Sequence, residues 1–393
     1  MTLASKQTKG IEEVISSRAD VAIIGGGPAG SSTAIALARA GLSVVVLERM
    51  ERPRLRVGET LPPSIRLELD KLGVWAEFQR AGHLPSVGNR SVWGSAKPFD
   101  NDFIFNPYGS GWHVDRQRFD EMLLSAAQSS GAKVLNGMGL AGLEYESNRG
   151  WQLEMECTAG RALINARFVV DASGRASAFA RLCGIRRCSL DKLIGIVGYL
   201  DARLDHPTGE RITLVEAVRD GWWYSALLPD GKLVVVYMTD TDIAAIQKLR
   251  ESEQWLARLN QTRYTRERVE SHNYELEAAT HIVSANSSRL EAVAGNCWLA
   301  VGDAAASYDP LSSQGISTAL STGINAAKSI QDYFEGKPDA LKDYADSLEK
   351  NFAAYLLNRR AYYAIEKRWP DSIFWRRRVD APGARATESA TAS

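Results

Sequence analysis

The chain has 393 residues, 45% of them hydrophobic, which is enough to bury the cores of about two or three structural lobes. Lys and Arg together number 47, as do Asp and Glu, so the formal net charge is zero. This balance argues against nucleic acid as a partner. The sequence has no continuous apolar stretch of about 18 residues, and its first residues are polar and lack a signal-peptide core. We therefore expect a cytoplasmic protein without stable membrane insertion.

The four cysteines give no sign of a metal site. They are Cys157, Cys183, Cys188 and Cys297, and no two have the C-x-x-C spacing of a zinc or redox motif. We interpret them as reduced, structural thiols and predict no bound metal.

The segment Asp20–Glu48 has the pattern strand, glycine turn, helix, strand. A short apolar run leads into Gly25-x-Gly27-x-x-Gly30. Gly25 allows a tight turn, and Gly27 removes a Cβ where the backbone would touch a pyrophosphate. Gly30 allows the following helix to pack closely on the strand. These positions predict a strand-to-helix turn that binds phosphate.

The flanking residues strengthen this interpretation. Pro28 suits a first helical turn, and the helix is predicted to run from Pro28 to Ala40. The second strand, Val44–Leu47, ends beside Glu48, which follows Gly30 by 18 residues. A carboxylate there can accept both hydroxyls of an adenosine ribose and would repel a 2′-phosphate. The pattern predicts dinucleotide binding and leaves open which dinucleotide is bound.

The middle of the chain is typical of a second lobe built from antiparallel strands. Residues 86–112 are rich in aromatic residues and glycine, and four more strands are predicted at 193–205, 211–218, 222–228 and 233–239. One helix is expected over 241–259. Arg116 lies just before another predicted helix and could equally be a surface arginine.

A second focus lies toward the C-terminus. A strand ending in Gly302-Asp303 can place a carboxylate at the ligand edge of a parallel sheet. The next loop leads into a long helix, whose free amides at Gln314, Gly315 and Ile316 can stabilise negative charge by roughly 0.3–1 kcal/mol, or about 2 when partly buried. A further helix is expected over 339–367, and the tail 380–393 is expected to be disordered. Residues 376–378, three arginines, would form a solvated helix end or dock a protein substrate or anionic carrier.

With these pieces in place, the chain resembles FAD-dependent monooxygenases of the aromatic hydroxylase superfamily over residues 20–333. The glycine turn with Glu48 matches the ADP-binding element, and Arg116 matches an arginine near the FAD phosphates. Gly302-Asp303 and the Pro310 loop match the motif whose aspartate holds the ribityl chain and whose helix faces the flavin pyrimidine. Residues 171–174 match the middle Asp-Gly motif only loosely. The resemblance assigns FAD binding to Gly25, Gly27, Pro28, Ala29, Gly30, Glu48, Arg49, Arg116, Asp303, Pro310, Gln314, Gly315 and Ile316.

The resemblance implies an α/β fold: a Rossmann-like FAD-binding domain of the GR2 type, an inserted antiparallel-sheet substrate domain, and C-terminal helices. The expected FAD-binding domain is discontinuous and comprises 18–85, 113–190 and 285–335. The expected substrate domain comprises 86–112 and 191–284, and the C-terminal helical segment is 336–379.

Within the superfamily, Val57-Gly58-Glu59, the PLSSQGI loop and the RWPDSIFWRRR ending resemble the flavin-dependent halogenase branch. This branch includes relatives that do not halogenate, such as the maturases that oxygenate a tryptophan in tryptophylquinone enzymes. Two halogenase features are missing. The Trp-x-Trp-x-Ile-Pro element appears only as the altered segment 222–229, and residues 88–93 lack the expected lysine, for which Lys97 is the nearest candidate.

The resemblance therefore implies an FAD monooxygenase that uses reduced flavin and O₂, through a C4a-hydroperoxide, to hydroxylate an aromatic substrate. That substrate would be a tryptophan side chain of a partner protein or a natural-product intermediate, either free or carrier-bound. The alternatives are a flavin-dependent halogenase, a saturase of the geranylgeranyl reductase type, and a protein that merely retains FAD. Electrons would come from NAD(P)H or from a separate flavin reductase. The oligomeric state stays open.

No catalytic residue is assigned. Glu59 is either a proton donor or a loop carboxylate with its hydrogen bonds satisfied. Aromatic rings of the second lobe could stack on an aromatic substrate, or could simply belong to the sheet and core. The candidate substrate residues are Trp93, Trp222, Trp223 and Tyr224.

Overall fold

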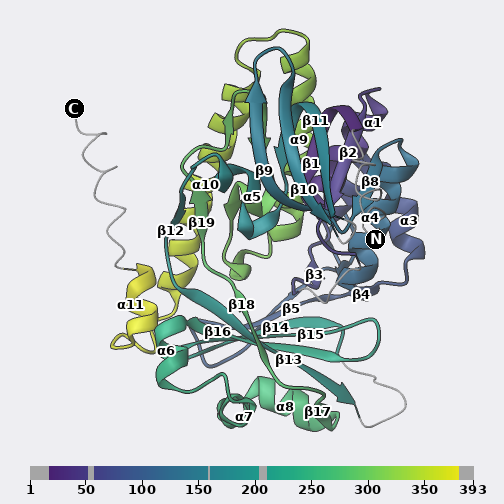
Figure 1. Ribbon diagram of the computed structural model, residues 1–393. Coiled ribbons are helices and arrows are strands. Elements are labelled where there is room, and N and C mark those ends of the chain that lie inside the picture. Colours follow the sequence, from purple (N-terminus) through teal and green to yellow (C-terminus); the bar gives the residue numbers. More distant parts are fainter. Residues whose placement is uncertain (1–16, 52–56, 158–159, 203–209, 380–393) are drawn as a thin grey trace, which may run out of the picture.

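The computed structural model describes residues 17–51, 57–157, 160–202 and 210–379 (Figure 1). The predicted disordered tail lies outside these ranges. Within them, no helix combines the length and the apolar character that crossing a membrane would require.

The upper part of the molecule in Figure 1 is built on a mixed sheet. Its strands pair in the order β20-β21-β11-β1-β2-β8, and β10 and β9 extend it from β11 as an antiparallel ribbon. Strands β21, β11, β1, β2 and β8 run parallel to one another, and β20 is antiparallel to β21. The bounds are β1 (Ser17–Ile24), β2 (Val44–Glu48), β8 (Lys133–Asn136), β9 (Gly139–Glu146), β10 (Gly150–Cys157), β11 (Gly160–Asp171), β20 (Ala294–Gly295) and β21 (Trp298–Ala300).

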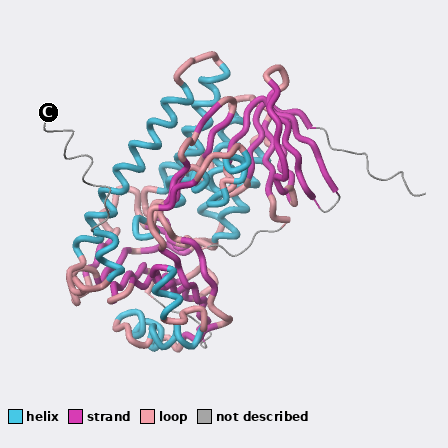
Figure 2. Tube along the Cα trace, turned by 60° about the vertical axis from the view of Figure 1, so that its left-hand side comes forward, coloured by secondary structure: helices cyan, strands magenta, loops and turns pink. Residues whose placement is uncertain are grey.

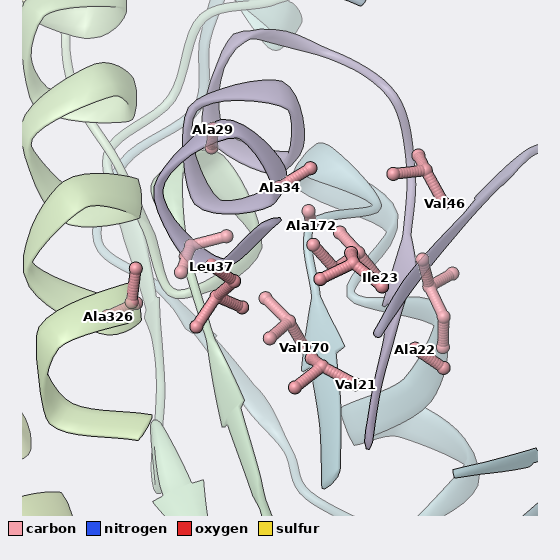
Figure 3. Packing of buried hydrophobic residues seen from close by; sticks show 14 of the residues in the cluster. Val21, Ala22, Ile23, Ala29, Ala34, Leu37, Val46, Val170, Ala172 and Ala326 are labelled. Atoms are coloured by element: carbon pink, nitrogen blue, oxygen red, sulfur yellow. The ribbon is translucent and has the colours of Figure 1, made fainter. Parts of the chain in front are cut away.

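Helices α1 (Pro28–Arg39) and α4 (Arg116–Ser129) pack against this sheet and each other, and α9 (Gly315–Phe334) packs against α1. Figure 3 shows α1 lying between the strands and α9. Val21, Ile23 and Leu37 are fully buried there. Each such side chain contributes roughly 1.5–3 kcal/mol when removed from water, so this core fixes the first glycine turn in place.

Helix α1 is buried along most of its length, and its small residues make that possible. An added Cβ on Gly30 would lie 1.9 Å from the Gly25 carbonyl oxygen, and one on Gly323 would lie 2.0 Å from Ser32 Oγ. The hydroxyls of Ser32 and Thr33 donate to the Ala29 carbonyl, at 2.9 and 2.8 Å. The buried helix therefore leaves neither hydroxyl without a partner.

A second sheet forms the lower part of the molecule, visible in Figures 1 and 2. Its strands pair in the order β17-β13-β16-β15-β14-β5-β6, with β18 also on β13. All of these pairs are antiparallel except β14 with β5. The bounds are β5 (Gly88–Val92), β6 (Phe99–Asp102), β13 (Leu193–Ala202), β14 (Ile212–Val218), β15 (Gly221–Leu227), β16 (Leu233–Asp240), β17 (Tyr274–Leu276) and β18 (His281–Ser284).

Two small sheets and several short helices complete these parts. One sheet contains β3 (Thr60–Leu61), β4 (Leu84–Ser86) and β7 (Gly111–His113), and the other β12 (Arg187–Ser189), β19 (Ser288–Leu290) and β22 (Ala306–Ser307). The short helices are α2 (Ile65–Lys71), α3 (Trp75–Arg80), α5 (Ala178–Leu182), α6 (Thr241–Ile246), α7 (Ser252–Leu259) and α8 (Tyr264–Ser271). The single helix predicted over 241–259 is wrong, because the chain leaves helical geometry between α6 and α7, where Lys248 has φ +51°.

Helix α10 (Ala340–Ile365) descends from the upper sheet to the lower one and ends beside α11 (Ile373–Val379) (Figure 1). The described chain thus has the predicted α/β arrangement, with an antiparallel second sheet and C-terminal helices. The residue-by-residue division into domains stays a prediction.

Candidate flavin site

The predicted nucleotide-binding residues meet at one edge of the upper sheet. Parallel strands β1, β2, β11 and β21 all end there, and the chain continues from them into the glycine turn, Glu48, the 171–174 turn and Gly302-Asp303. Ligands of open α/β sheets bind at the carboxyl ends of the strands. The topology therefore gathers four separate sequence motifs at the edge where a dinucleotide would bind.

Glu48 is already engaged with the backbone of this edge. Its Oε2 accepts the Gly26 N–H at 2.7 Å, and its Oε1 accepts the Met50 N–H at 2.9 Å. A carboxylate has about four acceptor positions, so two remain for ribose hydroxyls. The neighbouring Arg49 is exposed and Gly27 caps α1 in extended geometry.

Asp171, at the end of β11, has a structural role. Its Oδ1 accepts from the Ser173 hydroxyl at 2.6 Å, and its Oδ2 accepts from the Ala180 N–H at 3.0 Å. Burial raises the pKa of this carboxyl, while these donors act to lower it. The carboxylate therefore shapes the turn and the start of α5, and its bonds are internal to the fold.

Asp303 lies near the positive charges of three arginine side chains. Arg175 Nε is 3.5 Å from its Oδ2, and 40% of the Asp303 side chain is exposed. Burial of the rest raises the pKa of the carboxyl, whereas Arg175, Arg187 and Arg116 act to lower it. Arg187 Nη2 is buried, and none of the described residues forms a hydrogen bond with it. A ligand with acceptor groups suits this unused donor.

Part of the loop after Asp303 is exposed to solvent. Pro310, Gln314 and Gly315 are exposed, and α9 begins at Gly315. The N-terminus of this 20-residue helix offers free N–H groups and the positive end of the helix dipole. Ile316 is half-buried one residue into the helix. The predicted anion-stabilising position is thus accessible to a ligand.

Arg116 lies at the base of the Val57-Gly58-Glu59 loop. Its Nη1 donates to the Val57 carbonyl at 2.7 Å, and its Nη2 is 3.2 Å from Asp120 Oδ1. An added Cβ on Gly58 would lie 2.8 Å from Arg116 Nη1. Arg116 therefore holds this loop, and its charge also acts on the Asp303 carboxyl of the site.

Glu59 is buried in the same place, with 2% of its surface exposed. Its Oε2 accepts the Gly58 N–H at 2.9 Å, and its Oε1 accepts the Tyr199 hydroxyl at 3.3 Å. Burial raises the pKa of Glu59, although these donors and Arg116 act to lower it. The next residue, Thr60, bonds the Tyr224 hydroxyl at 2.6 Å. A buried carboxyl, whose pKa is shifted toward the protonated form, therefore lies between the two sheets.

Three of the four candidate substrate residues share one hydrophobic cluster. Trp222 is in its core, and Trp93 and Tyr224 pack against it together with Val57 and Leu311. The rings of Trp93 and Trp222 meet edge to face, with centroids 6.3 Å apart. This aromatic wall, defined as Trp93, Trp222 and Tyr224, thus adjoins the loop that contains Pro310.

Trp223 lies on the opposite face of β15, because successive strand residues alternate in direction. Only 1% of it is exposed, and it stacks on Tyr237 with centroids 4.6 Å apart and meets Trp255 edge to face. The structure therefore does not bring it together with the aromatic wall.

A polar cavity of about 620 Å³ runs between α9 and α10. Gln314 lines one part of it, but Lys328, Asp332 and Asn351 line it far along both helices, away from the sheet edge. We therefore do not assign this cavity to the flavin. In the described part of the chain, no group of His, Cys, Asp or Glu side chains is arranged to hold a metal ion.

These features fit FAD. The site combines a glycine turn, a carboxylate with free acceptor positions, an unused buried guanidinium donor and an open helix N-terminus. Gly302 also has φ +54°, and an added Cβ there would lie 2.7 Å from that of Ala29, so the two cofactor motifs are packed together.

Comparison with known proteins identifies the class. Residues 18–358 match the family model described as an FAD binding domain, so the chain belongs to this family. It is an FAD-dependent oxidoreductase, and FAD is its cofactor. The predicted fold class and family resemblance are thereby confirmed.

Two relatives define the branch. LodB of Marinomonas mediterranea, named as an FAD-dependent oxidoreductase, is 30% identical over 366 residues, covering 91% of this chain and 96% of LodB. The tryptophan 2-halogenase of Chondromyces crocatus is 27% identical over 365 residues, covering 90% of this chain and 69% of that protein. The chain is thus halogenase-like.

Solved structures agree. The myxobacterial chondrochloren halogenase CndH has a TM-score of 0.84 at 25% identity, covering 95% of this chain and 89% of CndH. The peptidyl tryptophan dihydroxylase QhpG has a TM-score of 0.74 at 24% identity, covering 92% of this chain and 79% of QhpG, a likeness in fold.

Proposed function

We propose that this oxidoreductase is a monooxygenase that uses reduced FAD and O₂ to hydroxylate an aromatic group. The observation that carries the proposal is the contact between the aromatic wall and the loop of residues 309–314, which we call the flavin-side loop. Trp93, Trp222 and Tyr224 pack in one cluster with Leu311 of this loop. An aromatic group stacked on this wall would lie beside the loop that the family places against the flavin.

The residues of this chain would bind, orient and protect the reacting groups. Reduced FAD, when bound, supplies the activation of O₂. The free amides of Gln314, Gly315 and Ile316 would stabilise negative charge on the bound flavin. Glu59, held by Gly58 and Tyr199 and with its pKa raised by burial, would supply a proton between the sheets. The Thr60–Tyr224 hydrogen bond helps to close this region to water.

For the substrate we propose an indole-sized group, either a tryptophan side chain of a partner protein or a natural-product intermediate. A relative named as a tryptophan 2-halogenase supports an indole. Edge-to-face or offset contacts with Trp93, which is only partly buried, would hold such a ring, since aromatic pairs of this kind are worth about 0.5–1.5 kcal/mol beyond their buried area. Trp222, of which 1% is exposed, packs against Trp93 and would keep it in place.

Halogenation is the second candidate, and the halogenase names among the relatives favour it. The side chains argue against it. No lysine is buried in the described ranges of the chain, and Lys97, the nearest candidate for the halogenase lysine, is exposed.

The test is rapid mixing of the anaerobically reduced, FAD-loaded protein with oxygenated buffer, with and without chloride or bromide. N-acetyl-L-tryptophanamide serves as the aromatic probe, and ¹⁸O₂ reports the source of product oxygen. Hydroxylation predicts a transient absorbing species before oxidised flavin returns, and one ¹⁸O atom in the product without halide. A halogenated product that requires halide would replace the proposal with the second candidate. Direct return to oxidised flavin under every condition would contradict both.

A further inference from the structure

Side chains of helix α10 form hydrogen bonds with the flavin-side loop. Three of its side chains, Tyr355, Arg359 and Tyr363, are spaced by four residues and so lie on one face of the helix. The Tyr355 hydroxyl accepts the Asp309 N–H at 2.7 Å. The other two side chains reach the Asp309 carboxylate, which directly precedes Pro310.

Asp309 is the centre of this contact, with 1% of it exposed. Its Oδ2 accepts from Arg359 Nε at 3.1 Å and from the Tyr363 hydroxyl at 2.8 Å. Its Oδ1 accepts the Leu311 N–H at 3.0 Å. Arg359 also pairs with Asp191 at 2.9 Å. The buried charge is therefore both paired and hydrogen-bonded, as a buried carboxylate requires.

The other side of Tyr363 faces the aromatic wall. Its hydroxyl accepts the Trp222 Nε1–H at 3.1 Å, and its ring meets that of Trp93 edge to face with centroids 5.6 Å apart. Indole can only donate and a carboxylate can only accept, so the direction of the chain is fixed: Trp222 donates to Tyr363, which donates to Asp309. Burial and the Asp309 carboxylate raise the pKa of Tyr363 well above its ordinary value, which keeps the donating proton in place.

The loop itself contains a residue that needs such support. Ser313 has φ +51°, a left-handed conformation that is unfavourable for a residue other than glycine. Strained residues of this kind persist when the surrounding structure supports them. The Ser313 N–H donates to the Pro310 carbonyl at 3.0 Å, and the preceding N–H groups of Ser312 and Leu311 donate to Asp309.

We propose that Tyr363 is a positioning residue that joins the aromatic wall to the flavin-side loop through the hydrogen bonds Trp222–Tyr363–Asp309. The loop then keeps one geometry against the flavin, and that geometry depends on the orientation of the Trp222 indole. This inference rests on FAD binding, which the family establishes, and does not depend on the oxygenation proposed above. The two can therefore fail separately.

The test compares Tyr363→Phe with Tyr362→Phe in the FAD-loaded protein. Tyr362 is the matched control, since it is the preceding residue of α10 and 60% of it is exposed. Three properties are measured: hydrogen exchange of the 311–313 amides, the midpoint potential of the bound FAD, and the Tm. We expect Tyr363→Phe to speed exchange at these amides by about tenfold, the equivalent of one net hydrogen bond, and to shift the potential. Tyr362→Phe should change neither the exchange of these amides nor the midpoint potential.

Equal exchange and equal potential in the two variants would overturn the proposal. If Tyr363→Phe does not fold, Trp222→Phe provides the second test, because it keeps an aromatic ring and removes the indole N–H. Faster exchange at residues 311–313 in that variant supports the link, and unchanged exchange there overturns it.

Discussion

The Tyr199 hydroxyl, from the lower sheet, donates to the Glu59 carboxylate, from the loop below the upper sheet, at 3.3 Å. The bond joins the two sheets at the point where the aromatic wall and the flavin-side loop also meet. Burial raises the pKa of Glu59 and of Tyr199, which favours the protonated form of each. Only 2% of Glu59 is exposed, so a proton on its carboxyl would be shielded from bulk water.

Replacing Glu59 by Gln removes that proton and keeps the shape of the side chain. If Glu59 supplies a proton during hydroxylation, product formation should fall by about 10²-fold or more, because positioned acids contribute about 10²–10⁴-fold. Steady-state rates with N-acetyl-L-tryptophanamide measure this, and FAD affinity should be unchanged. Activity of the parent should also decline as the pH rises through the raised pKa, whereas the variant's profile should lack that limb. An unchanged rate would show that Glu59 is only a satisfied loop carboxylate.

The same substitution makes a stability prediction with a defined sign. A folded-state pKa above the unfolded value stabilises the fold at low pH, and this contribution is lost as the pH rises through the folded pKa. Glu59→Gln should therefore be more stable than the parent at alkaline pH, and the difference should vanish below the ordinary value of 4.5. Urea unfolding at a series of pH values measures it, and a difference independent of pH would contradict burial as the cause.

Glu48→Gln tests the ribose site. Gln cannot accept from both Gly26 and Met50 and still offer two free acceptor positions, so FAD affinity should fall by about 10- to 100-fold, the value of one or two charge-assisted bonds. Titration of apoprotein with FAD measures the Kd. The exposed Glu51→Gln is the matched control and should bind FAD like the parent. Equal affinities for both variants would remove Glu48 from the ribose site.

The local motifs could be predicted because the residues that define each motif lie close together in the sequence. Gly25 has φ +107°, and an added Cβ would lie 2.4 Å from the Ala172 carbonyl oxygen, so the position demands glycine wherever the fold places it. The role of Glu48 could be predicted because this residue lies at the end of the second strand of the motif. Trp223 shows a missed local signal: it is a candidate substrate residue together with Trp222 and Tyr224, yet the two-residue period of a strand puts it on the opposite face from both.

The long-range contacts gave no such signal. Tyr363 and Asp309 are 54 residues apart, and Glu59 and Tyr199 are 140 apart. Nothing near either residue in the sequence specifies its partner, because the partner depends on how α10 and the lower sheet dock on the upper one. The four-residue spacing of Tyr355, Arg359 and Tyr363 places them on one helix face, but it does not specify what that face contacts.

Gly323→Ala tests the close approach of α1 and α9. The added methyl group would lie 2.0 Å from Ser32 Oγ and 2.6 Å from the Ala29 carbonyl oxygen, and the backbone atom cannot move aside cheaply. We expect the free energy of unfolding to fall by about 1–3 kcal/mol or more. Gly139→Ala is the control, since its added Cβ has only an ordinary contact of 3.7 Å, and it should stay within about 0.5 kcal/mol. Similar losses in both variants would contradict tight packing at Gly323.

The C-terminal arginines differ from one another, and the prediction of a wholly solvated helix end is wrong. Arg378 Nη2 is 2.7 Å from Asp240 Oδ1, with 2% of each side chain exposed, and Arg377 is 2.9 Å from the same carboxylate. Only Arg376 of the three is exposed. These bonds fix α11 to the end of β16, so the helix is part of the lower sheet's support.

Asp240→Asn should therefore be costly, because it removes the buried negative charge that pairs with Arg378 and one of the two carboxylate oxygens to which that guanidinium donates. Removing one member of a buried pair costs about 3–5 kcal/mol, and urea unfolding should show a loss of this order. Arg376→Gln is the control and should stay within about 0.5 kcal/mol of the parent. If Asp240→Asn unfolds at the same urea concentration as this control, the ion pair contributes nothing and α11 must be held by its aromatic contacts, among them Trp375 against Trp93 at 5.1 Å between centroids.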